Sequence, residues 1–494
     1  MFKKILVANR GEIALRVMRT AREMGISTVA VYSEADRGAL HVRFADEAIC
    51  LGPAASSQSY LRGDKIIAEA LRLGVEAIHP GYGFLSENAA FCQAVTDAGM
   101  VFIGPTPHAI EIMGDKLASK RAVAEYNVPM VPGTPGAVSD PDEALRLAAE
   151  IGYPVLIKAS AGGGGKGMRV VERPEDLKAE MARASSEAAS AFGNGAVFVE
   201  KFVTKPRHVE VQVLGDTHGN VVHLFERECS IQRRHQKVIE EAPSAILTPE
   251  LRAAMGASAV AVAQSVHYTG AGTVEFLMDA DHKYYFLEMN TRLQVEHPIT
   301  ELITGIDLVR EQINIAAGKP ISFRQEDLRI HGHALELRVY AEDPTNRFLP
   351  DVGTLHTYRR PQGPGIRLDD GFEEGMEIPI HYDPMIAKLC AWGANREQAI
   401  DRMLRAIAEY RINGVKTTLA FGAFAIDSVP FRTGDFDTKF VEQHFDPEKL
   451  KRDNADEAEI AALLAARLHS QRQVSQGAAS AVSRPRTAWQ LNRS

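Results

Sequence analysis

The sequence predicts an α/β and α+β protein of several domains that begins with a doubly wound parallel sheet. Its 494 residues, 45% of them hydrophobic, are enough for about three domains with sizeable cores. The first hundred residues alternate short apolar runs with amphipathic helical patterns, which is typical of a parallel sheet covered by helices. From about Lys116 longer strands and hairpins replace this alternation, which indicates a change of domain.

The alternation in the first part predicts its elements in order. Strands are expected at Ile5–Ala8, Ser27–Tyr32, Ala77–His79 and Met100–Ile103. Helices are expected at Glu12–Met24, Tyr60–Leu73 and Asn88–Ala98. Gly25 follows the first helical pattern directly, as a helix-ending glycine does. We therefore place an N-terminal α/β domain at residues 1–114.

The rest of the chain divides into a central unit at residues 115–330, a third domain at 331–446 and a tail at 447–494. The third domain mixes strands, one of them at Ala334–Tyr340, with a helix near Arg396–Glu409. The tail begins with a helical pattern at Ala455–His469 and continues as Gln471–Ser494, a stretch rich in Ser, Ala, Gln and Arg without acids. Such a composition cannot bury enough apolar surface to fold alone, so the end of the tail is predicted to be disordered.

The charge and the cysteines exclude several classes of protein. A net charge of −8 gives no reason to expect nucleic-acid binding. The four cysteines form no CxxC pair, which favours reduced thiols in the cytoplasm over a zinc or redox site. The first apolar run is too short for a signal peptide, and none is long enough to cross a bilayer. We expect a soluble cytoplasmic enzyme.

A run of four glycines lies in the segment VLIKASAGGGGKGMRVV. It satisfies GxGxxG literally, but the residues that follow, Met168–Val171, form a strand pattern where a dinucleotide site needs a helix. Walker A fails because Lys166 is followed by Gly167. What remains is a strand–loop–strand flap whose backbone amides can approach phosphate oxygens, with Lys158 and Lys166 to neutralise charge. The alternative is an ordinary hairpin tip.

Two glutamates are predicted to face each other in the next hairpin, whose arms are Thr273–Met278 and Lys283–Asn290. A two-residue loop would place Glu275 and Glu288 diagonally, and a four-residue loop would place them directly opposite each other. Asn290 continues the same face. Like charges so close destabilise a sheet unless a cation lies between them, and oxygen ligands of this kind suit Mg²⁺. The alternative is a solvated polar face.

Polar side chains continue on both sides of this hairpin. Downstream, the alternation persists as Arg292, Gln294 and Glu296, a set that could hold a small oxyanion and supply a base. Upstream, one face of a strand carries His208, Glu210 and Gln212, and the other face carries valines. A basic cluster lies between them at Arg233, Arg234, His235 and Lys237, for which an exposed surface is an equally good interpretation.

At this point the chain resembles the biotin carboxylases over residues 1–446. The likeness rests on several long motifs in the same order. In the first part these are NRGEIA at Asn9–Ala14, HPGYGFLSEN at His79–Asn88 and MGDK at Met113–Lys116. In the second they are KASAGGGGKGM at Lys158–Met168, EKF at Glu200–Phe202, RHVE at Arg207–Glu210, QRRHQKV at Gln232–Val238 and EMNTRLQVEHPITE at Glu288–Glu301.

The resemblance implies a three-domain ATP-grasp enzyme and a set of site residues. The implied fold is an N-terminal doubly wound parallel sheet, an ATP-grasp unit with a glycine-rich lid at about residues 131–203, and a C-terminal α+β domain. By resemblance, ATP is bound by Lys116, Lys158, Gly164, Gly165, Glu200, Lys201, Val203, His208, His235, Glu275 and Glu288. Two Mg²⁺ or Mn²⁺ ions are expected on Glu275, Glu288 and Asn290. Bicarbonate is expected at Lys237, Arg292, Gln294 and Val295, and biotin at Tyr82 and Arg338. The implied catalytic residues are Lys237, Arg292, Glu296 as the base, and Arg338.

The implied reaction is the first half-reaction of an acyl-CoA or pyruvate carboxylase. Bicarbonate attacks ATP to give carboxyphosphate, and the enolate of biotin captures the CO₂ that forms. No AMKM-like biotin attachment sequence occurs in the 494 residues. We therefore expect biotin on a separate carrier protein, together with a carboxyltransferase and, by resemblance, a homodimer. The alternatives are another ATP-grasp ligase with a different acceptor, and a non-catalytic nucleotide sensor. The residues that follow Asn290, together with Arg338, favour biotin carboxylation.

Overall fold

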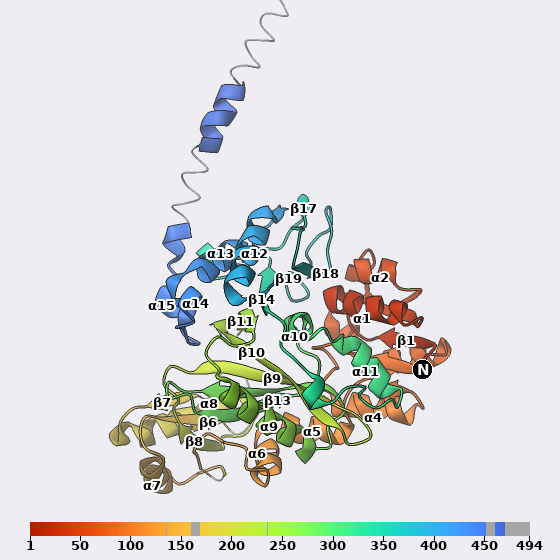
Figure 1. Ribbon diagram of the computed structural model, residues 1–494. Helices are drawn as coiled ribbons and strands as arrows, with labels where there is room; N and C mark the ends of the chain where they lie inside the picture. The colour runs from red at the N-terminus through yellow and green to blue at the C-terminus, as the bar shows by residue number, and fades with distance from the viewer. Residues whose placement is uncertain (135, 160–167, 235, 451–459, 470–494) are drawn as a thin grey trace, which may run out of the picture.

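The computed structural model describes residues 1–134, 136–159, 168–234, 236–450 and 460–469 (Figure 1). Its first domain is a five-stranded parallel sheet of order β3-β2-β1-β4-β5, which confirms the predicted doubly wound sheet. The strands are β1 (Lys4–Val7), β2 (Ser27–Ser33), β3 (Glu47–Gly52), β4 (Ala77–His79) and β5 (Val101–Phe102). The helices are α1 (Gly11–Glu23), α2 (Leu40–Phe44), α3 (Gly63–Arg72), α4 (Ala89–Asp97) and α5 (Pro107–Gly114).

The sequence pattern did not predict β3, α2 and α5. The strand β3 lies at the edge of the sheet and pairs only with β2, so most of its residues are partly or fully exposed. Its sequence, EAICLG, therefore lacks the continuous apolar run of the strands beside it. The predicted start of α4 is confirmed by its cap, because the Asn88 side chain accepts a hydrogen bond from the amide of Phe91 at 2.8 Å.

An eight-stranded antiparallel sheet runs through the middle of the molecule in the order β13-β12-β9-β10-β11-β14-β19-β18. Its first part consists of β9 (Arg207–Gly215), β10 (Val221–Arg233), β11 (Gln236–Ala242), β12 (Gly270–Met278) and β13 (Tyr284–Asn290). Its second part consists of β14 (His333–Tyr340), β18 (Ile366–Asp370) and β19 (Met385–Gly393). Because β11 pairs with β14, a single sheet joins the central unit to the C-terminal domain.

The helices around this sheet are α6 (Lys116–Ala124), α9 (Pro249–Ser265), α10 (His297–Thr304) and α11 (Leu308–Ala316). The C-terminal domain adds α12 (Arg396–Glu409), α13 (Leu419–Asp427), α14 (Val429–Thr433) and α15 (Phe440–His444). Its short strands are β15 (Glu342–Asp343), β16 (Leu349–Pro350), β17 (Thr357–Arg359) and β20 (Arg411–Asn413). The helix predicted at Arg396–Glu409 is therefore confirmed, and so is the strand predicted at Ala334–Tyr340, which lies within β14.

A small lobe projects from the central unit, at the lower left of Figure 1. It is a three-stranded sheet of order β7-β6-β8, made of β6 (Val155–Ala159), β7 (Arg169–Val171) and β8 (Val197–Lys201). Two helices, α7 (Pro141–Ile151) and α8 (Leu177–Phe192), pack on it and give it an apolar core of its own. The predicted strands on either side of the glycine run are confirmed, while the run itself lies outside the described residues.

The three domains meet in a buried ionic network. Arg16 of α1 donates hydrogen bonds to Glu301 of α10 and to Asp307, both at 2.8 Å. Arg367 of β18 donates to the other oxygen of Glu301 at 2.7 Å. Since breaking a buried ion pair leaves an uncompensated charge, this network resists separation of the domains. The three-domain arrangement is as predicted, and the individual domain boundaries remain predictions.

The tail and the cysteines add little to the fold. Within the described part of the tail, residues 460–469 are helical and exposed; the remainder of the helix predicted at Ala455–His469, and Gln471–Ser494, lie outside it. All four cysteines are described, and none forms a disulfide. Among the described helices, none combines the length and the apolar character that crossing a membrane requires.

Candidate functional site

The hairpin β12–β13 places the two predicted carboxylates directly opposite each other, Glu275 against Glu288. Five residues connect the strands, more than in either predicted register, because β12 ends at Met278 and β13 begins at Tyr284. A bulge at Leu287, which the pairing skips, restores the register, so Asn290 pairs with Thr273. The prediction that both carboxylates are neighbours is therefore confirmed, although the turn that achieves it differs.

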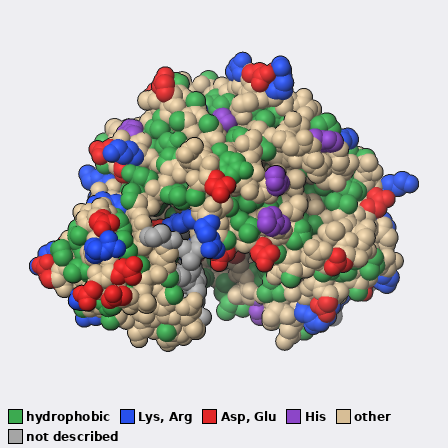
Figure 2. Space-filling view, turned by 90° about the horizontal axis from the view of Figure 1, so that it is seen from below, with side chains coloured by type: hydrophobic (Ala, Val, Ile, Leu, Met, Phe, Trp, Pro, Cys, Tyr) green, Lys and Arg blue, Asp and Glu red, His purple; other side chains and the backbone are tan. Residues whose placement is uncertain are grey.

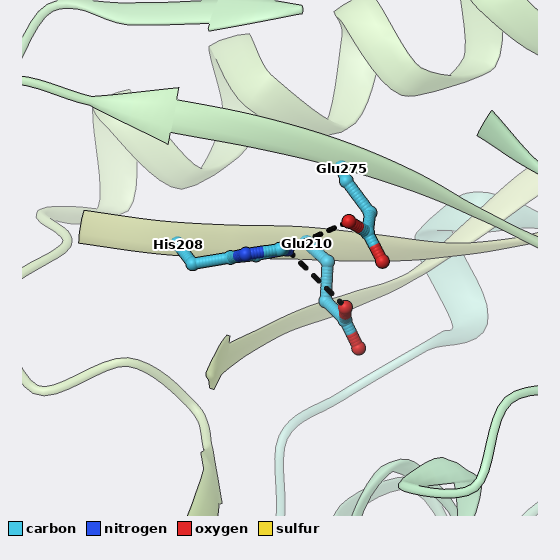
Figure 3. Close-up of side chains that lie close together, drawn as sticks. All are labelled: His208, Glu210 and Glu275. Atoms are coloured by element: carbon cyan, nitrogen blue, oxygen red, sulfur yellow. Dashed lines mark ion pairs between the residues drawn. The ribbon is translucent and has the colours of Figure 1, made fainter. Parts of the chain in front are cut away.

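Glu275 is surrounded by donors. Its carboxylate lies 2.8 Å from Nε2 of His208 and accepts hydrogen bonds from Lys237 at 2.9 Å, Asn290 at 2.9 Å and Gln294 at 2.8 Å. Figure 3 shows His208 reaching from β9 towards this carboxylate, beside Glu210 of the same strand. Although burial opposes ionisation, Lys237 and His208 hold the pKa of Glu275 well below its usual range. Glu275 is therefore ionised.

Glu288 is less well compensated. Burial and then the charge of Glu275 raise the pKa of its carboxyl above the usual value, and the charges of Lys116, His208 and Lys237 oppose this shift only in part. The two carboxylates thus meet on one face of the ribbon beside the side-chain amide of Asn290, whose nitrogen donates to Glu275 and whose oxygen accepts from Arg292. This oxygen-rich donor set fits a hard divalent cation such as Mg²⁺ or Mn²⁺.

Lys237 bridges three carboxylates. Its ammonium donates to Glu210, to Glu275 at 2.9 Å and to Glu296 at 2.8 Å, and only 12% of its side chain is exposed. Burial disfavours the charge, but the three carboxylates raise the pKa of Lys237 well above its usual range. A permanent cation therefore lies between the paired glutamates of the hairpin and the predicted base.

The predicted basic cluster of Arg233, Arg234, His235 and Lys237 does not stay together in the structure. Gln232 pairs with Lys237 across β10 and β11, and Arg233 pairs with Gln236, so Arg233 lies on the opposite face from Lys237. There Arg233 forms an ion pair with Glu342 of β15. Arg234 lies at the turn with a φ of 48°, and His235 is outside the described residues. Of the described members, only Lys237 reaches the site.

Glu296 lies between two cations. Its carboxylate accepts from Lys237 at 2.8 Å and from Nη2 of Arg338 at 3.0 Å, and Nε of Arg338 donates to Glu240 at 2.7 Å. Although burial opposes ionisation, Lys237 and Arg338 hold the pKa of Glu296 well below its usual range. The side chain is therefore ionised, which is the state that a base requires.

The predicted strand alternation beyond Asn290 is wrong as secondary structure. The strand β13 ends at Asn290, residues 291–296 form an irregular segment, and α10 begins at His297. Gln294 nevertheless donates to Glu275 of the central sheet, whereas Arg292 donates to Asn290 at 2.9 Å and to Glu87 of the N-terminal domain at 2.8 Å. Tertiary contacts, and not the pleat, bring these side chains together.

Figure 2 shows a hollow between the small lobe, at the left, and the main body, with basic side chains at its rim. The predicted nucleotide residues that the structure describes come from both of these parts. On the lobe, Lys158 of β6 donates to Glu200 of β8 at 2.7 Å. Lys201 donates to the carbonyl oxygens of Gly152 and Tyr153 at 2.8 and 3.0 Å. Val203 is buried, and Lys116 begins α6. Gly164, Gly165 and His235 lie outside the described residues.

Tyr82 lies in the loop after β4, which Asn9 fixes by donating to the carbonyls of Pro80 and Tyr82, both at 2.7 Å. The Tyr82 hydroxyl donates to Glu12. Burial raises the pKa of Tyr82 well above its usual value, and the nearby charge of Arg338 opposes this shift. The two residues predicted to meet biotin are thus close enough to interact electrostatically.

Two supporting residues were not singled out from the sequence. Arg227 of β10 is fully buried and donates to Glu210 at 2.6 Å, to Gln212 at 2.7 Å, to Gln294 at 2.8 Å and to two threonines. Glu240 of β11 fixes Arg338. A signal for Arg227 exists in the sequence, because a strand face carrying Glu210 and Gln212 must find a buried cation if it is buried. Nothing local indicates Glu240.

A small lobe beside an antiparallel sheet with paired carboxylates is the arrangement of an ATP-grasp ligase. The family models that match are "Biotin carboxylase, N-terminal domain" at residues 1–110, "Carbamoyl-phosphate synthase L chain, ATP binding domain" at 115–324 and "Biotin carboxylase C-terminal domain" at 336–443. The chain belongs to the biotin carboxylase family. Its activity is the ATP-dependent carboxylation of biotin by bicarbonate, which sets aside a non-biotin ligase and a non-catalytic sensor.

Individual relatives agree with this assignment. A pyruvate carboxylase subunit of Methanothermobacter thermautotrophicus is 56% identical over 444 residues, which cover 90% of each chain. Biotin carboxylase of Nostoc sp. is 52% identical over 90% of this chain and 99% of its own. The biotin carboxylase domain dimer of Hydrogenobacter thermophilus 2-oxoglutarate carboxylase, solved with MgADP, ADP and bicarbonate, superposes with a TM-score of 0.84 at 50% identity. It covers 90% of this chain and 98% of its own.

Replacing Arg227 with methionine should remove the cation that holds Glu210 and Gln294. We expect a loss of stability of about 1–3 kcal/mol, because the buried acceptors on Glu210 and Gln212 lose a donor while Lys237 still pairs with Glu210. We also expect at least about a tenfold fall in kcat from the displaced Gln294. Chemical unfolding and steady-state ATP hydrolysis measure the two effects. Arg252→Met is the matched control, since Arg252 pairs with the buried Glu226 away from the site at 2.8 Å; an equal loss of kcat in both variants would contradict the assigned role.

Proposed function

We propose that the site carboxylates biotin in two stages, with Glu296 as the base of the first. Glu296 takes the proton of bicarbonate, whose oxygen attacks the γ-phosphate of ATP to give carboxyphosphate and ADP. Carboxyphosphate divides into CO₂ and phosphate, the phosphate takes the N1 proton of biotin, and the resulting enolate captures CO₂. The observation that carries this proposal is the ammonium of Lys237 within hydrogen-bond distance of both Glu275 and Glu296, which joins a cation-binding ribbon to the base.

ATP is proposed to lie between the small lobe and the central sheet. The groups assigned to it are Lys116, Lys158, Gly164, Gly165, Glu200, Lys201, Val203, His208, His235, Glu275 and Glu288. Two Mg²⁺ or Mn²⁺ ions are assigned to Glu275, Glu288 and Asn290, where bound metal would offset charge on the triphosphate. The deficit of positive charge around Glu288 supports this assignment. A closed lobe would keep water from carboxyphosphate.

Bicarbonate and biotin are assigned to neighbouring groups. Bicarbonate is proposed to contact Lys237, Arg292, Gln294 and Val295. Biotin is proposed to contact Tyr82 and Arg338, with the guanidinium stabilising the enolate oxygen. Arg338 suits that role because Glu240 and Glu296 fix it before substrate arrives, so little reorganisation is needed when charge develops.

We propose that biotin reaches this site on a separate carrier polypeptide and that a carboxyltransferase consumes the product. The archaeal relative is one subunit of a pyruvate carboxylase, and the solved relative is a dimer, which together support a multi-chain assembly and a homodimer. The unpaired cysteines suit a reducing compartment, the cytoplasm. The carboxyltransferase, and not this chain, would select an acyl-CoA or a 2-oxo acid as final acceptor.

Free biotin should stimulate ATP hydrolysis by the purified chain in the presence of Mg²⁺ and bicarbonate. We expect no hydrolysis without bicarbonate, a slow rate with bicarbonate alone, and a rise of several-fold on adding biotin, because the enolate removes CO₂ as it forms. Phosphate release measures the rate. Desthiobiotin, which lacks the sulfur of the tetrahydrothiophene ring but keeps the ureido group, serves as a control for ring recognition. Hydrolysis at the same rate with and without bicarbonate would refute the proposal.

Replacing Glu296 with alanine should separate binding from chemistry. Without a base at this position turnover should fall by about 10²–10⁴-fold, while ADP binding, which relies on other groups, should change by less than about threefold. Calorimetry measures the affinity and phosphate release measures the turnover. Glu226→Ala is the matched control, because Glu226 is also buried and forms its ion pair with Arg252, which is none of the proposed site residues. Turnover retained in Glu296→Ala would remove Glu296 as the base.

Replacing Glu288 with glutamine should shift stability and metal binding in opposite directions. Removing one of two facing carboxylates should stabilise the ligand-free protein by about 0.2–1 kcal/mol, because the like-charge repulsion disappears. Affinity for Mg-ADP should fall at least about tenfold, because an anionic ligand is lost. Thermal unfolding without and with Mg-ADP measures both. Asp281→Asn in the exposed loop of the same hairpin should change neither; a destabilised apo protein in Glu288→Gln would contradict the charge deficit.

A further inference from the structure

Lys388 is a fully buried lysine whose ammonium group lies at the edge of the site. The reaction scheme above gives it no role. It lies on β19, and its Nζ donates to the carbonyl oxygen of Val295 at 3.0 Å. The same nitrogen lies 3.3 Å from Glu12 and 4.0 Å from Asp369. Burial disfavours its charge, but Glu12 and Asp369 raise the pKa of Lys388 above its usual value. The group is a permanent cation beside the peptide that precedes Glu296.

The register of the sheet explains this placement. Arg338 of β14 and Lys388 of β19 are directly opposite each other, so their side chains leave the same face. Arg338 holds the carboxylate of Glu296 at 3.0 Å, and Lys388 holds the main-chain oxygen of the residue before it. Two neighbouring strands of the C-terminal domain thus fix consecutive residues of the irregular segment 291–296. That segment pairs with no strand, so these contacts define the course of its backbone.

The second partner of Lys388 belongs to the N-terminal motif NRGEIA. Glu12 is buried at the first turn of α1, and one of its oxygens both accepts from the Tyr82 hydroxyl and faces Lys388. Asn9 of the same motif holds the Tyr82 loop from its backbone side. The C-terminal domain approaches this motif closely, since a Cβ on Gly371 would lie only 2.8 Å from the Glu12 amide nitrogen. The motif therefore positions Tyr82 relative to β19.

A purely structural ion pair is the competing interpretation. Burying charged groups contributes little net stability, and the network of Arg16, Glu301 and Arg367 already joins the same domains. An ion pair that served only to hold the domains together would not require the hydrogen bond from Lys388 to the carbonyl oxygen of Val295. The contacts of Lys388 lead instead to the two proposed substrate contacts, Val295 and Tyr82.

We propose that Lys388 is a positioning residue that holds the Val295–Glu296 peptide and, through Glu12, the Tyr82 hydroxyl in one fixed relation. The bicarbonate pocket and the biotin contact are thereby aligned across three domains. This inference rests on the roles proposed above for Val295, Glu296 and Tyr82. Lys388 itself contacts no substrate, so its loss should disturb those two substrates and leave the nucleotide unaffected.

The test is a comparison of Michaelis constants for Lys388→Met and Arg396→Met. We expect Lys388→Met to lower kcat/KM for bicarbonate and for free biotin by about tenfold or more, because small displacements of positioned groups are costly. Its KM for ATP should stay within about twofold. Arg396 lies in the same domain as Lys388 and pairs with the buried Glu241 of β11 at 2.7 Å, but it contacts none of the proposed site residues. Arg396→Met should therefore lose stability without this selective effect. The inference would be overturned if both variants had the same kcat/KM for bicarbonate and biotin. It would also be overturned if the KM for ATP rose in Lys388→Met as much as the other two constants change.

A second variant keeps the test decisive if Lys388→Met does not fold. Glu12→Gln preserves the size and the acceptor for Tyr82 but removes the charge that faces Lys388, and it should raise the KM for biotin several-fold. No change in that constant would overturn the inference as well. The wild-type enzyme distinguishes the two levels of proposal: absence of biotin-stimulated hydrolysis there would refute the proposed reaction, whereas normal wild-type behaviour with unaffected variants would refute only the role of Lys388.

Discussion

Compensation of buried negative charge is the constraint on which the site depends. Glu210, Glu275 and Glu296 converge in a region that water hardly reaches, and each would be unstable as an anion without a cation in contact. Lys237 touches all three. Arg227 and Arg338 complete the balance from the two sides. The strands that carry Glu210 and Glu275, and the segment that carries Glu296, are therefore held together by charge as well as by backbone hydrogen bonds.

Within the β12–β13 hairpin, the charge balance is incomplete at Glu288. Glu275 is satisfied by Lys237 and His208, whereas Glu288 opposite it retains a carboxyl that is reluctant to ionise. A divalent cation would correct the deficit, and a triphosphate would in turn supply the ligands that such a cation needs. The hairpin is therefore suited to a metal–nucleotide complex more than to either component alone.

The sequence predicts local features well and long-range contacts poorly. The parallel sheet follows from alternation, and the facing of Glu275 and Glu288 is robust because every plausible turn leaves them neighbours. The end of β13 at Asn290 could not be predicted, since Arg292, Gln294 and Glu296 keep the alternation of a strand without forming one. The sequence did not predict roles for Arg227, Glu240 and Lys388. Those roles depend on pairing between strands far apart in sequence, such as the pairing of Arg338 with Lys388.

The irregular segment 291–296 shows why three domains are needed. The N-terminal domain contacts its start, where Glu87 accepts from Thr291 and Arg292. The central sheet contacts its middle through Arg227 on Gln294, and the C-terminal domain contacts its end through Arg338 and Lys388. Because segment 291–296 has no strand hydrogen bonds of its own, its conformation is set by contacts with all three domains. The groups proposed to act on bicarbonate can therefore be in place only when all three domains contact this segment.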